Sequence, residues 1–390
     1  MKILHTIQGL DVLSGGPSTC TKDLMEGLRQ QEVEVELFTL KCKNPNSYNL
    51  GEGSDWLIEA PCDYFSPLFI SKNFHSFLLN SEYDLYHTNG LWMYANHITC
   101  KIARKKKKPY IVSPHGMLYA NALKIKPWRK KLMLKVWFDK DVKKADCLHV
   151  TCNKEMEHCR KYGYTGPIAV IPNPVVFPSG VNIKNLDFET SDGTPTIKKI
   201  GVLARLNPIK KIENLLQAAS IVVNKGVAPF DILIMGSGNK DYEVFLKKEA
   251  AKLGISSHVH FLGFVDGREK YDRLACLRAL FVPSESENFG MIVPEALICG
   301  TPVYASLGTP WGELNEYNAG WWRDNSPESI AKVIEDVLTM STDQLITMGR
   351  NGRALMEEKY KQEIVAKQMS ELYYWILNKN KINKPTFVYE

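Results

Sequence analysis

The chain has 390 residues, which is enough for two domains that each bury a hydrophobic core. Its hydrophobic fraction of 44% and charged fraction of 24% are typical of a globular protein, and no apolar run reaches the roughly 20 residues that span a bilayer. Nine cysteines without paired spacing argue against a disulfide scaffold and favour a reducing compartment. The N-terminal residues lack the long apolar stretch of a secretory signal, so we expect a cytoplasmic protein.

The net charge of +6 is concentrated in residues 101–161, which we call the basic region. This region holds 18 Lys or Arg against 5 Asp or Glu, an excess of +13. Helical spacing within it predicts a helix with an apolar stripe facing the core and cations on the opposite face; the stripe is Trp128, Leu132, Val136 and Asp139. Such a cationic face is either solvated or binds anionic lipid, and nucleic acid is less favoured because no nucleic-acid module accompanies the charge. We therefore expect contact with an anionic membrane surface and no nucleic-acid partner.

In the first half of the chain, short apolar runs alternate with amphipathic stretches. We expect strands at 3–7, 33–40, 84–88, 110–114, 147–151 and 168–175, and helices near 17–30, 92–105 and 127–145. Strands that alternate with helices predict a doubly wound parallel sheet. A stretch rich in Asn, Asp, Ser and Gly follows to about 195, so we assign residues 1–173 to an N-terminal domain.

The same alternation starts again in the second half. Strands are expected at 197–204, 230–238, 258–265, 279–284 and 302–306, and helices near 211–224, 241–254, 267–277 and 291–299. Three further helices near 327–340, 343–359 and 361–378 precede a polar tail. The fold class is therefore α/β, with a second Rossmann-like domain at 174–360 and a C-terminal helix and tail at 361–390.

Two glycines follow the first strand, at the edge of the sheet where open parallel sheets bind ligands. Gly15 and Gly16 precede Pro17 at the start of a helix, so their bare backbone can approach a phosphate there. A Gly-Gly-Pro sequence also occurs in plain turns, and both interpretations stay open.

The segment 283–303, PSESENFGMIVPEALICGTPV, places two carboxylates around a helix start. Glu287 lies in a strand-to-helix loop, Gly290 just before the helix, and Glu295 inside it. A loop carboxylate accepts hydrogen bonds from sugar hydroxyls, one in the first helical turns can hold a ribose diol, and free amides at a helix start attract a diphosphate. A surface helix with acidic residues near its N-terminus would have the same pattern.

The segment 201–219 begins with GVLARLNPIKK and supplies two cations. Arg205 directly follows a strand and Lys210 begins a helix. Fixed cations there can stabilise the charge on a departing diphosphate without a divalent metal, although two solvated surface cations would also fit. We expect no metal and no cofactor.

These segments together resemble glycosyltransferase family 4, retaining enzymes with the two-domain GT-B fold, over nearly the whole chain. SESENFGMIVPEALICGTPV is similar to the family's E-x7-E signature, with Glu287 and Glu295 at the acidic positions and Phe289 and Gly290 as the usual F-G. LARLNPIKK is similar to the family's R-L-x-x-x-K loop. SPHGML at 113–118 and GTPWGELNEYNAGWW at 308–322 resemble a bacterial subgroup tied to surface polysaccharide assembly.

The resemblance implies an N-terminal acceptor domain and a C-terminal donor domain facing a deep cleft, with the last helix crossing back to the N-terminal domain. It also implies that His115 faces the donor sugar and phosphate, that Arg205 and Lys210 hold the diphosphate, and that acceptor attack occurs on the front face. The implied catalytic residues are His115, Arg205, Lys210 and Glu287. The implied donor-binding residues are Gly15, Gly16, Arg205, Lys210, Gly236, Phe264, Val265, Glu287, Asn288, Phe289, Gly290 and Glu295.

Two positions depart from the family pattern. Lys211 stands where the family usually has Gly after the diphosphate lysine, and Asn288 stands where Gly usually precedes the Phe. Both positions act mainly through backbone in the family, so we expect the local geometry to shift without loss of binding.

The resulting prediction is a retaining, metal-independent hexosyltransferase that uses a nucleotide-diphosphate sugar and a lipid-linked saccharide acceptor. Its expected place is bacterial surface polysaccharide biosynthesis (O-antigen, capsule or exopolysaccharide), in the cytoplasm and peripheral on the inner face of the membrane. One alternative is a nucleotide-sugar epimerase or another GT-B enzyme. The other is a non-enzymatic nucleotide-sugar-binding protein, which would tolerate loss of His115.

Overall fold

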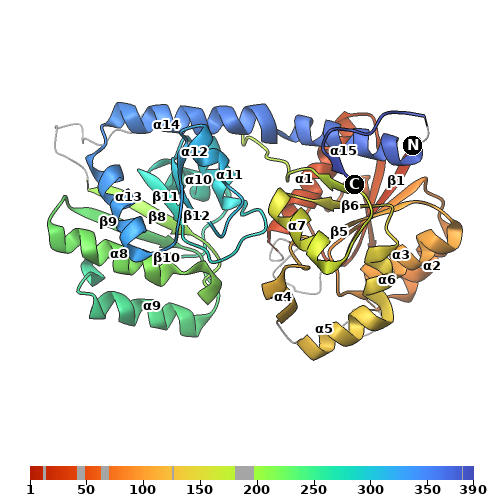
Figure 1. The fold of residues 1–390 in the computed structure, drawn as a ribbon, viewed down its shortest axis with the longest axis horizontal. Coiled ribbons are helices and arrows are strands. Elements are labelled where there is room, and N and C mark those ends of the chain that lie inside the picture. The colour runs from red at the N-terminus through yellow and green to blue at the C-terminus, as the bar shows by residue number, and fades with distance from the viewer. Residues whose placement is uncertain (12–14, 42–48, 63–69, 125–126, 181–196, 380) are drawn as a thin grey trace. The chain divides into compact units, whose positions relative to one another are not determined.

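A computed structural model describes residues 1–11, 15–41, 49–62, 70–124, 127–180, 197–379 and 381–390. Residue contacts divide the chain into two compact units (Figure 1). Unit 1 comprises Met1–Val176 and Tyr360–Glu390, and unit 2 comprises Phe177–Lys359. The first boundary lies three residues beyond the expected one at 173, and the C-terminal residues group with the N-terminal ones.

Unit 1 is built on an eight-stranded sheet in the order β14-β7-β6-β5-β4-β1-β2-β3. Its strands are β1 (Lys2–Ile7), β2 (Glu34–Leu40), β3 (Leu57–Ala60), β4 (Leu85–Asn89), β5 (Tyr110–Ser113), β6 (Cys147–Val150), β7 (Ile168–Val170) and β14 (Val388–Tyr389). All pairs are parallel except β14 with β7. The strand order reverses between β1 and β4, which is where doubly wound sheets bind ligands.

Helices cover both faces of this sheet, as is usual for a mostly parallel sheet with buried strands. They are α1 (Gly16–Gln30), α2 (Lys72–Asn80), α3 (Tyr94–Lys106), α4 (Ala120–Lys124), α5 (Pro127–Met133), η2 (Leu134–Phe138), α6 (Asp139–Lys143), α7 (Asn153–Tyr162) and α15 (Gln362–Leu377). Adjacent residues of β1 point to opposite faces: Ile3 packs with Leu24 and Val365, while Leu4 packs with Phe74 and Ile98. The N-terminal helix α1 and the C-terminal helix α15 therefore share one core.

Helix α1 approaches α15 closely at a glycine. A Cβ on Gly27 would lie 2.9 Å from Ala366 Cβ and 2.9 Å from Gln362 Cγ. The Gln362 side-chain amide also donates to the Asp23 carbonyl oxygen at 2.6 Å. Gly27 thus permits the docking of α15 onto unit 1.

Unit 2 contains a six-stranded parallel sheet in the order β10-β9-β8-β11-β12-β13. The strands are β8 (Lys198–Leu203), β9 (Phe230–Met235), β10 (Val259–Gly263), β11 (Ala279–Val282), β12 (Val303–Ser306) and β13 (Gly320–Arg323). The helical elements are η3 (Pro208–Lys210), α8 (Ile212–Lys225), α9 (Lys240–Lys252), η4 (Ser256–His258), α10 (Gly267–Ala275), α11 (Ile292–Ile298), α12 (Glu313–Glu316), α13 (Pro327–Thr339), α14 (Thr342–Leu355) and η5 (Met356–Tyr360). Here the strand order reverses between β8 and β11.

The main difference from the sequence-based expectations is the face that the helix of the basic region buries. It is interrupted by the π-helical turn η2, which rotates the residues after it relative to a regular helix. The buried residues are Phe138, Asp141 and Val142, whereas Trp128, Leu132 and Val136 are 66%, 57% and 58% exposed. The expected core-facing stripe was wrong, because it faces solvent.

The expected polar tail also needs correction, because Val388 and Tyr389 form β14 at the edge of the first sheet. The elements β3, α2 and β13 were not expected from the sequence. No helix within the described ranges is long and apolar enough to cross a bilayer.

Candidate functional site

In unit 2, the expected donor residues lie on the loops that follow the strands. Arg205 comes two residues after β8, and Glu287 lies in the loop after β11, so these residues border the point where the strand order reverses. Arg205 is exposed, and no described residue forms a hydrogen bond or ion pair with it. A cation at this position is available to an anionic ligand.

Lys210 and Glu287 are joined directly across the two loops. Lys210 Nζ lies 2.5 Å from Glu287 Oε1, and the Ser284 hydroxyl donates to the same oxygen at 2.8 Å. The two side chains are only 20% and 14% exposed, so water screens this pair weakly. The structure therefore brings together two residues that the sequence pattern predicted separately.

Lys211 adopts the left-handed backbone conformation that glycine favours, with φ +50°. It ends η3 and caps the start of α8. Lysine here holds a conformation that glycine favours, at some cost in strain.

Glu295 lies on α11 and pairs with a residue that the sequence reasoning missed. Lys270 on α10 donates to Glu295 Oε1 at 2.9 Å, and both side chains are less than one fifth exposed. Burial raises the pKa of Glu295, although Lys270 opposes this effect. Burial alone would lower the pKa of Lys270, but the Glu295 carboxylate outweighs it and the pKa is raised. The two side chains form a largely buried ion pair, and nothing near Lys270 in the sequence indicated it.

The Phe289–Gly290 turn is held by a tryptophan. Trp311 is 1% exposed, and its Nε1 donates to the Phe289 carbonyl oxygen at 2.6 Å while the two rings pack edge to face. Gly290 has φ +79°, a conformation that a side chain would strain. Asn288, just before them, is half-buried. This turn is a preformed loop rather than a flexible one.

The residues expected to contact the base lie after β9 and β10. A Cβ on Gly236 would meet the Ala204 carbonyl oxygen at 1.9 Å, so only glycine allows this close approach of two strand ends. Phe264 is 65% exposed, whereas Val265 is 6% exposed and belongs to the packed interior. Phe264 can offer a ring to a ligand, and Val265 can offer only its backbone.

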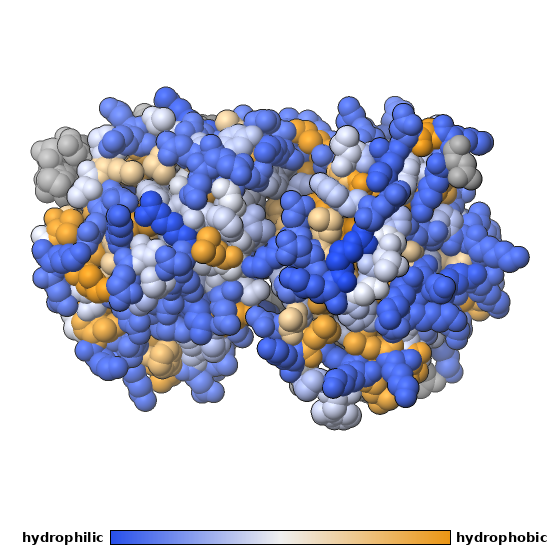
Figure 2. Space-filling model, viewed as in Figure 1, coloured by the Kyte–Doolittle hydropathy of each residue, from blue (hydrophilic) through white to orange (hydrophobic). Residues whose placement is uncertain are grey.

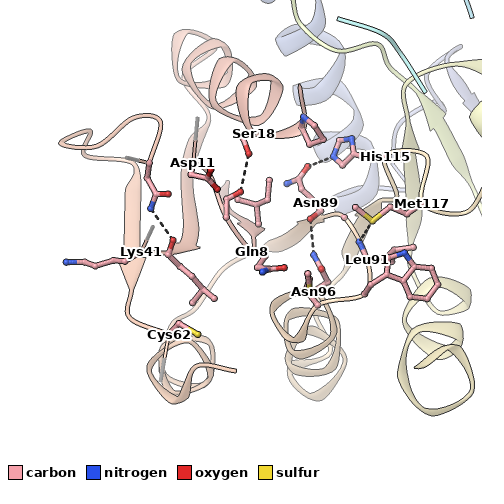
Figure 3. A pocket seen from close by; sticks show the side chains of 18 residues that line it. Gln8, Asp11, Ser18, Lys41, Cys62, Asn89, Leu91, Asn96, His115 and Met117 are labelled. Carbon is pink, nitrogen blue, oxygen red and sulfur yellow. Dashed lines mark hydrogen bonds between the residues drawn. The ribbon is translucent and has the colours of Figure 1, made fainter. Parts of the chain in front are cut away.

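Unit 1 contains a pocket of about 550 Å³ at the carboxyl ends of β1, β2 and β4 (Figure 3). His115 lines it, as do Gln8, Asn89, Asn96 and Trp92. Two lining residues other than glycine, Trp92 and His115, have positive φ values of +73° and +49°. Strained backbone of this kind concentrates at functional sites.

His115 is held from two sides. Its Nε2 lies 3.2 Å from Asn89 Oδ1, and the next backbone amide, of Gly116, donates to the buried carboxylate of Glu155 at 2.5 Å. Burial, with a smaller contribution from His149, lowers the pKa of His115 to about 3, so the imidazole is neutral near pH 7. Glu155 is a second residue that the sequence reasoning missed.

Gly15 caps the start of α1 with φ +80°, and Gly16 is the first residue of that helix. A Cβ on Gly15 would have open space around it. Pro17 and Ser18, which follow, line the same pocket as His115, whereas residues 12–14 lie outside the described ranges.

The expectation of no metal also assumed that the sequence lacks an Asp-x-Asp triplet that could hold a metal on a diphosphate, and this was wrong, because one is present at 139–141. Asp141 accepts from Arg104 at 2.6 Å and lies 2.7 Å from His97 Nδ1, while Asp139 pairs with Lys143 at 3.0 Å. Both carboxylates therefore have cationic or histidine partners. Among the described residues there is no cluster of three or more candidate metal ligands.

Comparison with known proteins gives a glycosyltransferase match for each half of the chain. A model described as Glycosyltransferase Family 4 matches residues 14–176, and one described as Glycosyl transferases group 1 matches residues 187–355. The uncharacterized glycosyltransferase MJ1607 of Methanocaldococcus jannaschii is 24% identical over 374 residues, which cover 92% of this chain and 94% of that protein.

Solved structures share the fold at low sequence identity. Anabaena Alr3699/HepE, in complex with UDP and glucose, aligns with a TM-score of 0.73 and 20% identity over 96% of this chain and 99% of that chain. WaaG, a glycosyltransferase involved in lipopolysaccharide biosynthesis, aligns with a TM-score of 0.67 and 13% identity over 95% of this chain and 99% of that chain. The first half of the chain thus matches a Family 4 glycosyltransferase model and the second half a group 1 model, and the whole chain shares the GT-B fold of these glycosyltransferase structures.

Proposed function

We propose that this protein is a retaining hexosyltransferase that moves a sugar from a nucleotide-diphosphate sugar to a lipid-linked saccharide in bacterial surface polysaccharide biosynthesis. The observation that carries the proposal is the Lys210–Glu287 pair beside the unpaired cation Arg205, at the reversal point of the second sheet. The similarity to HepE with bound UDP and glucose supports a UDP-sugar donor, and the similarity to WaaG supports a role in surface polysaccharide assembly.

Arg205 and Lys210 bind the donor diphosphate in this proposal. Because Lys210 already contacts Glu287, it is held in place before the donor arrives and needs little reorganisation. Glu287 accepts hydrogen bonds from sugar hydroxyls, and Glu295 accepts from the ribose diol while Lys270 balances its charge. Phe264 offers its exposed ring to the base, with backbone contacts from Gly236 and Val265.

The chemical step uses the cations in place of a metal. The bond between the sugar C1 and the diphosphate oxygen breaks, and the acceptor hydroxyl forms the new bond on the same face of the ring. The hydroxyl proton passes to the departing phosphate oxygen, and Arg205 and Lys210 stabilise the charge on the diphosphate. Neutral His115 forms a hydrogen bond with a substrate hydroxyl.

The pocket of unit 1 takes the acceptor saccharide. Its polar side chains Gln8 and Asn96 can bind sugar hydroxyls, and Trp92 can pack against a sugar ring. The Lys130 ammonium lies 5.3 Å from the centre of the Trp92 ring, which links the pocket to the basic region.

The basic region docks on an anionic membrane surface, where a lipid-linked acceptor would be found. Trp128, Leu132 and Val136 form an exposed stripe that we call the apolar stripe, and an apolar patch is visible in the area of α5 (Figure 2). Exposed cations flank it at 129, 131, 135 and 140. Apolar side chains beside lysines and arginines are typical of helices that lie in the interface of an anionic bilayer.

A transfer assay tests the proposal. Purified protein is incubated with UDP-sugars and a bacterial lipid extract, and the lipid products are analysed by mass spectrometry. We expect one lipid to gain a hexose with release of UDP, and the Lys210→Ala variant to form about 100-fold less product. Release of free sugar without an acceptor product would favour the epimerase or hydrolase alternative, and donor binding without turnover would favour the non-enzymatic one.

A further inference from the structure

A continuous chain of buried polar side chains leads from His115 through the sheet of unit 1 to helix α15. Its members lie on β1, β4, β5, β6 and α15. All members other than His115 are at most 5% exposed: Asn89, His5, Tyr373, His87, Ser113 and His149. None of these interior groups was used in the sequence-based reasoning about the site.

One half of this series of hydrogen bonds runs from the Ile171 carbonyl oxygen, just after β7, to α15. His149 Nε2 lies 2.9 Å from the Ile171 carbonyl oxygen, and His149 Nδ1 lies 2.7 Å from Ser113 Oγ. Ser113 Oγ also lies 2.7 Å from His87 Nε2. His87 Nδ1 then lies 2.8 Å from the Tyr373 hydroxyl oxygen.

The other half runs from α15 to the pocket. The Tyr373 hydroxyl oxygen lies 2.6 Å from His5 Nε2. Asn89 Nδ2 lies 3.4 Å from His5 Nδ1, and Asn89 Oδ1 lies 3.2 Å from His115 Nε2. Figure 3 shows the last of these contacts at the pocket wall.

All four imidazoles in this series of hydrogen bonds are neutral near pH 7. Burial lowers the pKa of His5 and His115 to about 3 and that of His149 to about 4, and it lowers the pKa of His87 well below the usual value. Burial also raises the pKa of Tyr373. Each neutral imidazole therefore has one donor and one acceptor nitrogen.

The donor and the acceptor of every hydrogen bond in the series can then be assigned by starting from the Ile171 carbonyl oxygen. A carbonyl oxygen can only accept, so His149 donates from Nε2 to Ile171, and its Nδ1 accepts from the Ser113 hydroxyl. Ser113 has then used its proton, so it accepts from His87 Nε2, and His87 Nδ1 accepts from the Tyr373 hydroxyl.

The same argument continues to the pocket. The Tyr373 oxygen accepts from His5 Nε2, and His5 Nδ1 accepts from the Asn89 amide. The Asn89 amide also faces the Thr6 carbonyl oxygen at 3.5 Å, which agrees with Nδ2 on that side. Asn89 Oδ1 therefore accepts from His115 Nε2, and His115 Nδ1 keeps its lone pair.

We infer that Tyr373 is a positioning residue for glycosyl transfer: through His5 and Asn89 it holds His115 with its proton on Nε2, so that Nδ1 accepts a hydrogen bond from a substrate hydroxyl. The inference rests on the proposed function for the identity of the substrate, and on the interior contacts of neutral imidazoles for the tautomer. Tyr373 belongs to α15, on the C-terminal segment that rejoins unit 1 at Tyr360. The last helix therefore contributes to the site rather than only covering the sheet.

Nuclear magnetic resonance of the substrate-free protein, labelled with ¹⁵N-histidine, tests the tautomer directly. Assignment uses the His115→Gln variant among the nine histidines. We expect His115 to be neutral and protonated on Nε2 at pH 7. A charged imidazole, or a proton on Nδ1, would overturn the inference without reference to activity.

The Tyr373→Phe variant tests the role of the hydroxyl group. It removes the acceptor of His5 Nε2 and the donor to His87 Nδ1, so we expect His115 to populate both tautomers. We also expect kcat to fall roughly tenfold or more from misplaced chemistry, with the donor KM unchanged. An unchanged His115 spectrum in folded Tyr373→Phe would contradict the inference.

Tyr164→Phe is the matched control, because Tyr164 is 1% exposed in the same unit and its hydroxyl donates only to the Ala145 carbonyl oxygen at 3.0 Å. It should lower the melting temperature without changing the His115 spectrum or kcat. If Tyr373→Phe fails to fold, two other spectra test the tautomer of His115. They are the wild-type spectrum and that of the Ser113→Ala variant, which interrupts the series of hydrogen bonds between His149 and His87. The expected tautomer together with no turnover of any nucleotide sugar would refute the proposed function and leave the positioning of His115 intact.

Discussion

Lys210 and Glu287 form an ion pair with 2.5 Å between Nζ and Oε1, and this pair joins the loop after β8 to the loop after β11. The backbone joins the same two loops, because the Glu285 amide donates to the Ile209 carbonyl oxygen at 2.8 Å. The cation is therefore fixed in position by contacts that do not depend on a ligand. Preorganised charge of this kind is the basis of electrostatic catalysis.

Replacement of Lys210 by alanine should reduce turnover about 100-fold, the usual effect of losing one preorganised charge. Steady-state kinetics with the physiological donor would measure this. Lys225→Ala is the control, since Lys225 forms an exposed pair with Glu335 on the surface of unit 2. Near-normal turnover in Lys210→Ala would show that the diphosphate does not use this cation.

Replacement of Glu295 by alanine should weaken nucleotide affinity. The change removes the proposed ribose ligand and leaves the Lys270 ammonium buried without its partner, which costs folding stability as well. Calorimetric titration with the nucleotide measures the affinity, and thermal unfolding separates the stability effect. Glu295→Gln should retain more stability but still bind less tightly, and wild-type affinity in both variants would refute the ribose assignment.

The apolar stripe should contribute to membrane binding independently of charge. A Trp128→Ala, Leu132→Ala, Val136→Ala triple variant should bind phosphatidylglycerol-containing vesicles with roughly 100-fold lower affinity in a pelleting assay, because each buried apolar side chain contributes on the order of 1 kcal/mol or more. A Val244→Ala, Phe245→Ala variant, which removes exposed apolar groups from α9, should bind like wild type.

Added salt separates the two contributions to vesicle binding. Salt should weaken the binding of the wild-type protein by screening the cations around the apolar stripe. Equal pelleting of the triple variant and the wild type, or no binding to anionic vesicles at all, would leave the basic region as a solvated surface.

Stability should fall when the pH is lowered from 6.5 towards 4. In the unfolded chain the four interior histidines have pKa values near 6.5, whereas in the folded protein those of His5, His115 and His149 are about 3, 3 and 4. In this window the unfolded state binds more protons, so the free energy of unfolding decreases by up to about 1.4 kcal/mol per pH unit for each histidine. A melting temperature that is flat between pH 6.5 and 4.5 would contradict the neutral interior chain, and His149→Gln should reduce the slope.

Replacement of Gly27 by alanine should destabilise unit 1, although the same change in an exposed helix stabilises by about 0.5 to 1 kcal/mol. The new methyl group would contact Ala366 and Gln362 at 2.9 Å, and overpacking of this kind costs about 1 to 3 kcal/mol. Thermal unfolding measures the change. An added Ala366→Gly substitution should recover part of the loss, and a stabilised Gly27→Ala protein would mean that α15 docks less closely than described.

Much of the fold could be predicted because buried parallel strands contain short apolar runs, and β5, β9 and β11 all stand out in this way. The strand β13 did not, because its four residues GWWR lack a run of aliphatic side chains. The pairing of β14 with β7 joins residues more than 200 positions apart, and no local pattern encodes it. The apolar stripe was misassigned because a second set of apolar residues in the same helix, Met133, Leu134, Trp137, Phe138 and Val142, is the one that packs into the core.

The candidate site was predictable where its residues belong to one continuous motif. Glu287 and Lys210 could be chosen from their spacing to strand ends, but their contact depends on β8 and β11 being neighbours in the sheet. Lys270, Glu155 and Tyr373 come from other elements: Lys270 contacts Glu295, Glu155 contacts the Gly116 amide, and Tyr373 contacts His5. Such partners leave no periodic signal in a single sequence.

Calorimetric titration of UDP, GDP, ADP and their sugar conjugates in the presence of EDTA tests the central claim most directly. We expect one nucleotide and its sugar conjugates to bind in EDTA, and the Lys210→Ala and Glu295→Ala variants to bind them more weakly. Absence of binding to every nucleotide sugar, or binding that requires a divalent metal, would contradict the metal-free donor site on which the proposed transferase rests.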